Sequence, residues 1–182
     1  MNIFSNVLKE SNDKSQLKSN FKKKTGGNFE FIDIHSSNAK KYIKSDSKLY
    51  KNINFIDKAI VGEIAIDKSN NKLAGYIFIS KTGTIQPMYV YDEYRGYGLS
   101  NILLKDAIEK YNANNLGVYS DNEVAIKLYE KFGFKKTKEK EYKDGDKVIF
   151  MSLDNKSIKH ENYITEMVKS ITYSKSFRDV KI

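Results

Sequence analysis

The chain has 182 residues, of which 40% are hydrophobic and 13% aromatic, so it is long enough to form one domain with a substantial core. It contains no cysteine, which excludes disulfides, thiolate metal sites and cysteine nucleophiles. The formal net charge is +9, but residues 1–27 carry +4 and residues 155–182 carry +3, which leaves +2 for the centre. We therefore expect a basic N-terminal extension over 1–27, a central domain over 28–154, and a basic helical extension over 155–182.

Targeting signals and metal sites are not expected. No segment has the apolar length of a membrane span, and the N-terminus does not follow a signal-sequence pattern, so a cytoplasmic protein is expected. His35 and His160 are far apart and in no metal-ligand spacing. The run Lys22–Lys24 is more typical of a solvated linker than of a nucleic-acid contact.

The first predicted elements are a strand, a helix and a hairpin. Apolar patterning predicts a strand over Asn28–Ile34 and a short helix over Ala39–Tyr50. Two further strands, Ala59–Ile66 and Leu73–Ile79, flank a polar turn at Asp67–Lys72, and a hairpin is the natural connection.

A strand over Thr84–Tyr91 comes next and contains Pro87, the only proline. Because proline lacks a backbone N–H, it indicates a sheet edge or a bulge. Gly96 and Gly98 follow in a turn, and apolar residues at helical spacing begin at Leu99. Glycines at a helix start let an anion approach unpaired N–H groups. The turn alone, however, is compatible with a purely structural role.

A second strand-to-helix unit lies downstream. Leu116–Tyr119 is the predicted strand, Asn122 is a suitable N-cap, and Tyr129 lies seven residues later on the same helix face. Gly133 is a natural helix stop. Two final strands, Lys135–Tyr142 and Lys147–Leu153, then flank an Asp-Gly turn.

The two units together resemble the GCN5-related N-acetyltransferase (GNAT) superfamily. The family's acetyl-CoA motif, Arg/Gln-x-x-Gly-x-Gly/Ala at the start of a helix, is similar to the segment Arg95–Ser100, and its later motif, Asn-x-x-Ala-x-x-Leu-Tyr-x-x-x-Gly-Phe, is similar to Asn122–Phe134. The resemblance covers roughly residues 28–154 in element order. It implies an α/β fold with a mixed, mostly antiparallel central sheet flanked by helices, to which this chain would add a C-terminal helix.

The resemblance also implies residue roles. Acetyl-CoA would be the acetyl donor, with its pantetheine arm and thioester held by the backbone of Met88 and Val90 and contacted by Asn122. Tyr129 would protonate the departing CoA thiolate, a role for which a phenol is chemically suited. The pyrophosphate would lie on the turn amides of six consecutive residues, which are Arg95, Gly96, Tyr97, Gly98, Leu99 and Ser100.

Two positions depart from the family pattern. Ser100 stands where glycine or alanine is preferred, and its small side chain is expected to preserve binding. Gly117 stands where N-terminal acetyltransferases of the ribosomal-protein type carry a catalytic glutamate. The general base is therefore open among Glu63, His35 and water, and the acceptor amine has no readable motif.

The main hypothesis is an acetyl-CoA-dependent N-acetyltransferase that transfers acetyl directly to a primary amine. The alternative is a catalytically inactive protein of the same fold that uses its basic tails to engage a protein or nucleic acid. A helical stripe of apolar residues within 158–172 is expected to pack on its own domain or to form a homodimer contact. It comprises Ile164, Met167, Val168 and Ile171.

Overall fold

The structure is a computed structural model that describes residues 29–47, 49–50 and 60–153. The two expected extensions, including the C-terminal stripe and its possible dimer contact, lie outside these residues. Among the described helices, none combines the length and apolar character needed to cross a bilayer.

The first half of the domain is an antiparallel sheet in the order β1-β2-β3-β4. The expected hairpin is confirmed between β2 and β3, where the Asn71 amide donates to the Asp67 carbonyl at 2.7 Å. A register shift between β3 and β4 gives β4 one extra residue around Pro87, so this proline occupies a bulge in an edge strand. The strands are β1 (Phe29–Asp33), β2 (Val61–Asp67), β3 (Lys72–Ile79) and β4 (Ile85–Val90).

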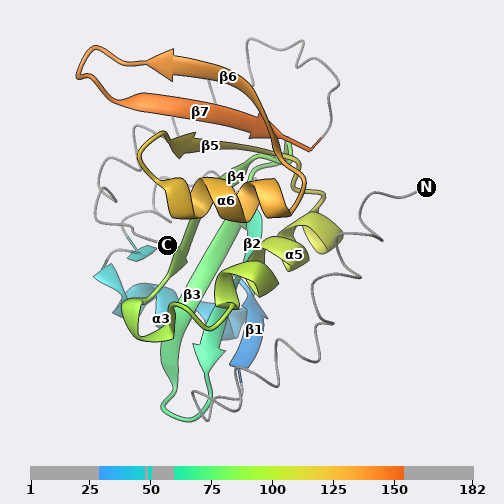
Figure 1. The fold of residues 1–182 in the computed structure, drawn as a ribbon. Coiled ribbons are helices and arrows are strands. Elements are labelled where there is room, and N and C mark those ends of the chain that lie inside the picture. The colour runs from blue at the N-terminus through green and yellow to red at the C-terminus, as the bar shows by residue number, and fades with distance from the viewer. Residues whose placement is uncertain (1–28, 48, 51–59, 154–182) are drawn as a thin grey trace.

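The second half contains a separate antiparallel sheet in the order β5-β7-β6. The central sheet expected from the sequence is thus present as two antiparallel sheets. The second sheet lies above the first in the view of Figure 1, and the only bridge between them among the described residues is a parallel one between Thr84 and Asn115. The strands are β5 (Asn115–Tyr119), β6 (Lys135–Glu141) and β7 (Lys147–Ser152).

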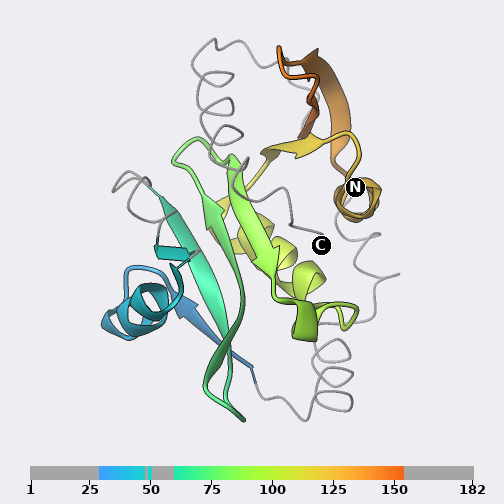
Figure 2. The same cartoon turned by 90° about the vertical axis from the view of Figure 1, so that its left-hand side faces the viewer.

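Helices α3 (Ser37–Ser45) and α5 (Leu99–Tyr111) cover opposite faces of the first sheet (Figure 2). This follows from strand alternation, because Ile64 and Ile66 pack in one cluster with α3, whereas Ala65 packs in the other with α5. Helix α6 (Glu123–Lys131) joins the α5 cluster and packs beside the second sheet.

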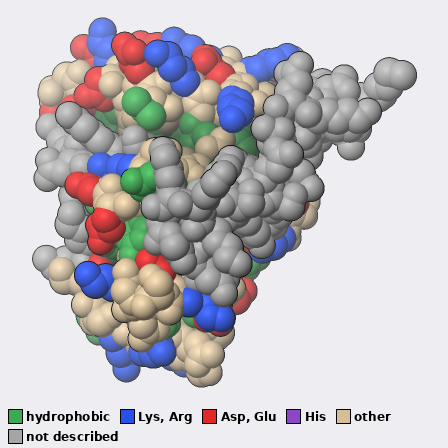
Figure 3. All heavy atoms as spheres, turned by 60° about the horizontal axis from the view of Figure 1, so that its bottom comes forward, with side chains coloured by type: hydrophobic (Ala, Val, Ile, Leu, Met, Phe, Trp, Pro, Cys, Tyr) green, Lys and Arg blue, Asp and Glu red, His purple; other side chains and the backbone are tan. Residues whose placement is uncertain are grey.

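Within the described residues the predicted elements are confirmed with small shifts at their ends, and the helical run predicted over 39–50 is interrupted at one residue, with residues 47, 49 and 50 helical again. Helix α3 begins after Ser36, whose side chain caps Ala39 N at 3.2 Å, and it ends at Ser45. The predicted helical run over 39–50 is broken because Asp46 adopts an extended conformation. On the face shown in Figure 3, lysine and arginine side chains are interspersed with acidic ones rather than gathered in one patch.

Candidate functional site

A bridge joins Thr84, just before β4, to Asn115, the first residue of β5, and the two strands then diverge (Figure 2). The space between the diverging strand backbones is called the gap below. The bridged end is held by Gly83, whose carbonyl accepts from Asn114 N at 2.8 Å. A Cβ on Gly83 would lie 2.8 Å from the Asn112 carbonyl oxygen, and its φ is +77°. The close approach of the two chain segments at this end therefore requires glycine.

The backbone of β4 presents alternate residues to this gap. The Tyr91 amide donates to the Ala74 carbonyl at 3.0 Å, so Tyr91 and Tyr89 direct their polar backbone groups toward β3. The N–H and C=O groups of Met88 and Val90 consequently face away from β3, toward the gap. Both predicted backbone binding residues thus lie along the open edge.

The turn after β4 leads directly into the start of α5. Gly96 and Gly98 both have left-handed backbones, with φ of +75° and +91°. Gly98 is the N-cap of α5, and no described side chain caps the first turn of the helix. Leu99 is buried beneath the turn and Ser100 is partly exposed. The exposed N–H groups and the helix dipole make this end suitable for an anion.

The Arg95 side chain turns back toward β4. Its Nε donates to the Val90 carbonyl at 3.0 Å, and Nη1 pairs with Asp92 at 2.8 Å. The guanidinium carbon lies 5.5 Å from the centre of the Tyr89 ring. The Arg95 cation therefore lies beside the turn, and its contacts are to the end of β4 and to its own loop.

Tyr94 anchors the turn to the β2–β3 hairpin. It ends the short 3-10 helix η1 (Asp92–Tyr94), and its hydroxyl donates to Asp67 Oδ2 and accepts from Asn70 Nδ2, both at 3.1 Å. Its ring packs edge-on against Phe29 with 5.7 Å between centroids. These contacts fix the position of the following glycine turn.

Helix α6 carries the two remaining predicted site residues. Asn122 is its N-cap, as predicted, and its side-chain oxygen accepts from Ala125 N at 3.2 Å. Tyr129 is buried with its ring edge-on to Phe134 at 5.9 Å. Burial raises the pKa of the Tyr129 hydroxyl, which therefore carries its proton at neutral pH.

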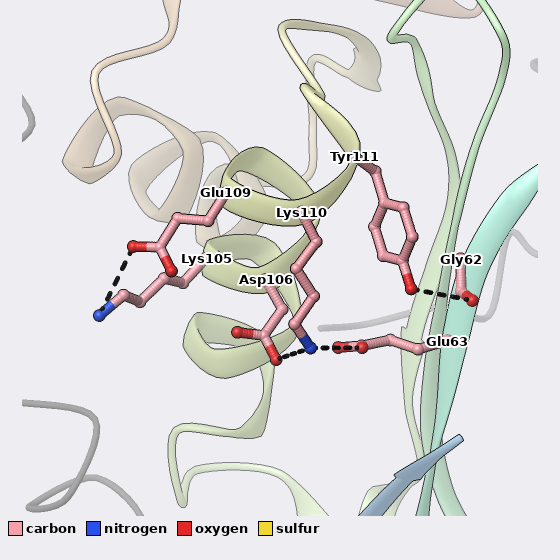
Figure 4. Close-up of polar contacts among 7 residues, drawn as sticks. All are labelled: Gly62, Glu63, Lys105, Asp106, Glu109, Lys110 and Tyr111. Atoms are coloured by element: carbon pink, nitrogen blue, oxygen red, sulfur yellow. Dashed lines mark hydrogen bonds and ion pairs between the residues drawn. The ribbon is translucent and has the colours of Figure 1, made fainter. Parts of the chain in front are cut away.

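The two side chains considered as general base are already engaged elsewhere. Glu63 points from β2 toward α5 and accepts from Lys110 Nζ at 3.0 Å, and Lys110 also contacts Asp106 at 2.9 Å (Figure 4). Burial raises the pKa of Glu63, and Lys110 opposes that rise. The other candidate, His35, has Nε2 within hydrogen-bond distance of the Ile60 carbonyl.

Distance also separates these groups from the gap. Glu63 lies two strands from β4, which is about 10 Å at the usual strand spacing, and His35 follows β1 at the opposite edge of the sheet. Gly117 pairs with Phe150 on β7, so β5 offers no carboxylate at that position. The described residues therefore leave the general base unassigned.

Several contributors to the site carry no sequence signal that would identify them. The Tyr94 anchor joins residues 27 positions apart, and the Tyr91 hydroxyl donates to Asp46, 45 positions away. Gly83 could be read from the sequence as a turn residue, but its close approach to Asn112 depends on the folded structure.

Comparison with known proteins identifies the same architecture. The protein-family model described as an acetyltransferase (GNAT) domain matches residues 22–155 of this chain. No curated protein matches the chain. Among solved structures, the Escherichia coli ribosomal-protein-S18-alanine N-acetyltransferase aligns with a TM-score of 0.54 and 18% identity, covering 73% of this chain and 100% of that one.

Arabidopsis thaliana NAA60 aligns similarly. Its complex with a bisubstrate analogue gives a TM-score of 0.52 and 16% identity, covering 71% of this chain and 100% of that one. Its complex with acetyl-CoA aligns with a TM-score of 0.50 and 15% identity, covering 68% of this chain and 97% of that one. At these identities the likeness concerns the fold.

Proposed function

The chain belongs to the GNAT acetyltransferase family, and on that premise we propose that it transfers acetyl from acetyl-CoA directly to a primary amine. The observation that carries the proposal is the adjacency of two features. An open strand edge at Met88 and Val90 leads within a few residues to a helix start without a described side-chain cap at Gly98. A long molecule with amides at one end and phosphates at the other matches both.

The residues present fit acetyl-CoA. The turn amides from Arg95 to Ser100 would hold the pyrophosphate, because the helix start carries partial positive charge and Gly96 has no atom within 4 Å of an added Cβ. The outward backbone groups of Met88 and Val90 would pair with the pantetheine amides and orient the thioester carbonyl. Asn122 would contact the pantetheine arm from α6 through its side-chain nitrogen, since the cap bond to Ala125 N uses only the side-chain oxygen.

Tyr129 would assist departure of the CoA thiolate. Its burial keeps the hydroxyl protonated, so a hydrogen is available for donation to the sulfur as negative charge develops. The amine nitrogen attacks the thioester carbon, the carbon–sulfur bond breaks, and the amine loses one proton while the sulfur gains one. No covalent intermediate on the protein is required.

The first experiment is an acetyl-CoA titration followed by an amine screen with labelled acetyl-CoA. We expect binding and acetyl transfer to at least one amine. Binding without transfer to any amine would favour the inactive-binder alternative, and absence of binding would count against both.

Tyr129→Phe tests the leaving-group role. We expect turnover to fall roughly a hundredfold, within the range typical of general acid catalysis, with acetyl-CoA affinity nearly unchanged. Tyr111→Phe is the control, because its hydroxyl approaches only the Gly62 carbonyl, at 3.5 Å, at the far end of α5. Equal turnover in the two variants would remove Tyr129 from the acid role.

A further inference from the structure

Both faces of the second sheet carry apolar side chains. On one face, Ile149 and Met151 of β7 pack in the same cluster as α6. Val148 and Phe150 alternate with them along the strand, so their side chains point to the opposite face. An antiparallel sheet that leaves one face in water normally places polar residues there. The sequence of β7 therefore indicates a sheet that is covered on both sides.

The second of these faces is buried without a described helix on it. Val148 is 0% exposed and Phe150 is 3% exposed. The hydrophobic side chains packed against them are Tyr119 and Tyr142, and no residue of a described helix belongs to this cluster. The Tyr142 hydroxyl is also buried, with no hydrogen-bond partner among the described residues. A covering segment is therefore required beyond the described residues, from this chain or from another copy.

The C-terminal segment leaves the fold directly from this sheet. It follows β7, and Leu153 N donates to the Asn114 carbonyl at 2.9 Å, which fixes the exit of the chain beside the start of β5. Residues 154–157 read Asp-Asn-Lys-Ser, a composition typical of turns. The eleven positions from Leu153 to Ile164 can span about 36 Å, whereas Val148 to Ser152 extends about 13 Å along β7. The segment can therefore turn back over the face.

The apolar stripe of this segment suits the face in length and at its margin. Its residues follow the i, i+3, i+4, i+7 spacing of one helix side, and from Ile164 to Ile171 a helix rises about 10 Å. Lys138 and Lys140 stand opposite the two buried residues of β7 in the sheet register, so they border the same face. Glu161 lies three positions before Ile164, at the margin of the stripe, where it can meet these lysines.

We infer that the C-terminal stripe docks on the face of the second sheet formed by Val148, Phe150, Tyr119 and Tyr142 of the same chain. The N-terminal extension is less suited, because it joins β1 at the far edge of the other sheet. Since β5 also borders the gap, the docked segment would lie beside the candidate site. The inference does not depend on the proposed acetyl transfer.

Cross-linking within the full chain tests this contact. The chain has no cysteine, so an introduced pair is the only possible source of a disulfide. Tyr119→Cys is combined in turn with a cysteine substitution at each stripe position, which are Ile164, Met167, Val168 and Ile171. The matched controls combine it with Glu166→Cys or Lys169→Cys, which fall on the other side of the same helical repeat. Oxidised glutathione drives closure, and non-reducing electrophoresis with intact mass separates closed monomers from linked dimers.

We expect at least one stripe position to close about tenfold faster than either control, within monomers. Equal rates on and off the stripe, or no closure at all, would overturn the inference. Disulfide-linked dimers as the main product would assign the face to a second copy. Faster closure with Val7→Cys, in the apolar part of the N-terminal extension, would assign it to that end of the chain.

A stability measurement without cysteines gives a second test. Val168→Asp places a charge in the stripe, so we expect the melting temperature to fall by about 5 °C as the apolar contact is lost. Lys169→Asp introduces the same side chain one position away, off the stripe, and should leave the melting temperature nearly unchanged. Equal melting temperatures for the two variants would contradict docking of the stripe.

Discussion

Lys110→Met tests how α5 is held on the sheet. Lys110 Nζ lies 3.0 Å from Glu63 Oε2 and 2.9 Å from Asp106 Oδ2 (Figure 4). The two carboxyl side chains are 3% and 2% exposed, whereas the lysine side chain is 45% exposed. Methionine retains most of the apolar stem and removes the charge, so the variant leaves two buried acids beside each other.

The expected loss of stability follows from the exposed fractions of these three side chains. Breaking a fully buried ion pair costs about 3–5 kcal/mol because a charge is left uncompensated. Water reaches nearly half of Lys110 and screens its charge, so we expect a smaller loss, about 2 kcal/mol. For a chain of this size that corresponds to a decrease of about 4–8 °C in the melting temperature.

The loss should depend on pH with a defined sign. Burial raises the folded-state pKa of Glu63 above its ordinary value of 4.5, and the hydrogen bond from Lys110 opposes that rise. A carboxyl with a raised folded pKa stabilises the fold fully below its unfolded pKa and loses that contribution as pH rises through the folded pKa. Without Lys110 the pKa of Glu63 rises further, so the free energy of unfolding of the variant should be lower at about pH 8 than at about pH 5.

Thermal unfolding followed by circular dichroism at both pH values measures this effect. Lys105→Met is the control, because Lys105 lies on the same helix and its contact to Glu109 is 3.7 Å. Adding Glu63→Gln to the Lys110 variant should restore much of the lost stability by removing the unpaired charge. Equal losses for the two lysine variants, or a loss independent of pH, would refute the reasoning.

Two further predictions concern the turn before α5. Gly96→Ala should weaken acetyl-CoA binding about tenfold through the strain of a left-handed alanine, whereas Gly145→Ala, equally open and at φ +85°, should lose only stability; equal affinity in the two variants, by titration, would exclude the turn from binding. Tyr94→Phe removes the bonds to Asp67 and Asn70, so it should lower the free energy of unfolding by about 1 kcal/mol and weaken acetyl-CoA binding with unchanged kcat. Tyr42→Phe, whose hydroxyl contacts Asn71 on the same hairpin, should leave acetyl-CoA affinity intact.

Local patterns in the sequence predicted much of this fold. The N-cap at Asn122 and the Asp-Gly turn before Asp146 are confirmed, because their geometry depends on residues within a few positions. The same is true of the unusual backbone at Pro87, where a missing N–H excludes an ordinary ladder position.

Local sequence patterns could not predict the contacts between segments that are distant in the chain. Nothing in the neighbourhood of Lys110 indicates that Glu63, 47 positions earlier, accepts its hydrogen bond. The divergence of β4 from β5 could not be derived from local patterns for a related reason, since each strand has ordinary patterning and their close approach at one end depends on packing around Gly83. The roles of Tyr129 and the turn amides came from the family resemblance and stay predictions.

The divergence of β4 from β5 leaves a strand edge with no paired neighbour in the middle of the molecule, a feature that ordinarily allows another polypeptide to add a strand and aggregate. Strand addition is hindered at both ends of this edge. Pro87 contributes no N–H and sits in a bulge, and Arg95 occupies the Val90 carbonyl. The N–H and C=O of Met88 and the N–H of Val90 remain for backbone pairing, which suits a slender partner bearing two amides and is too short to template a full strand.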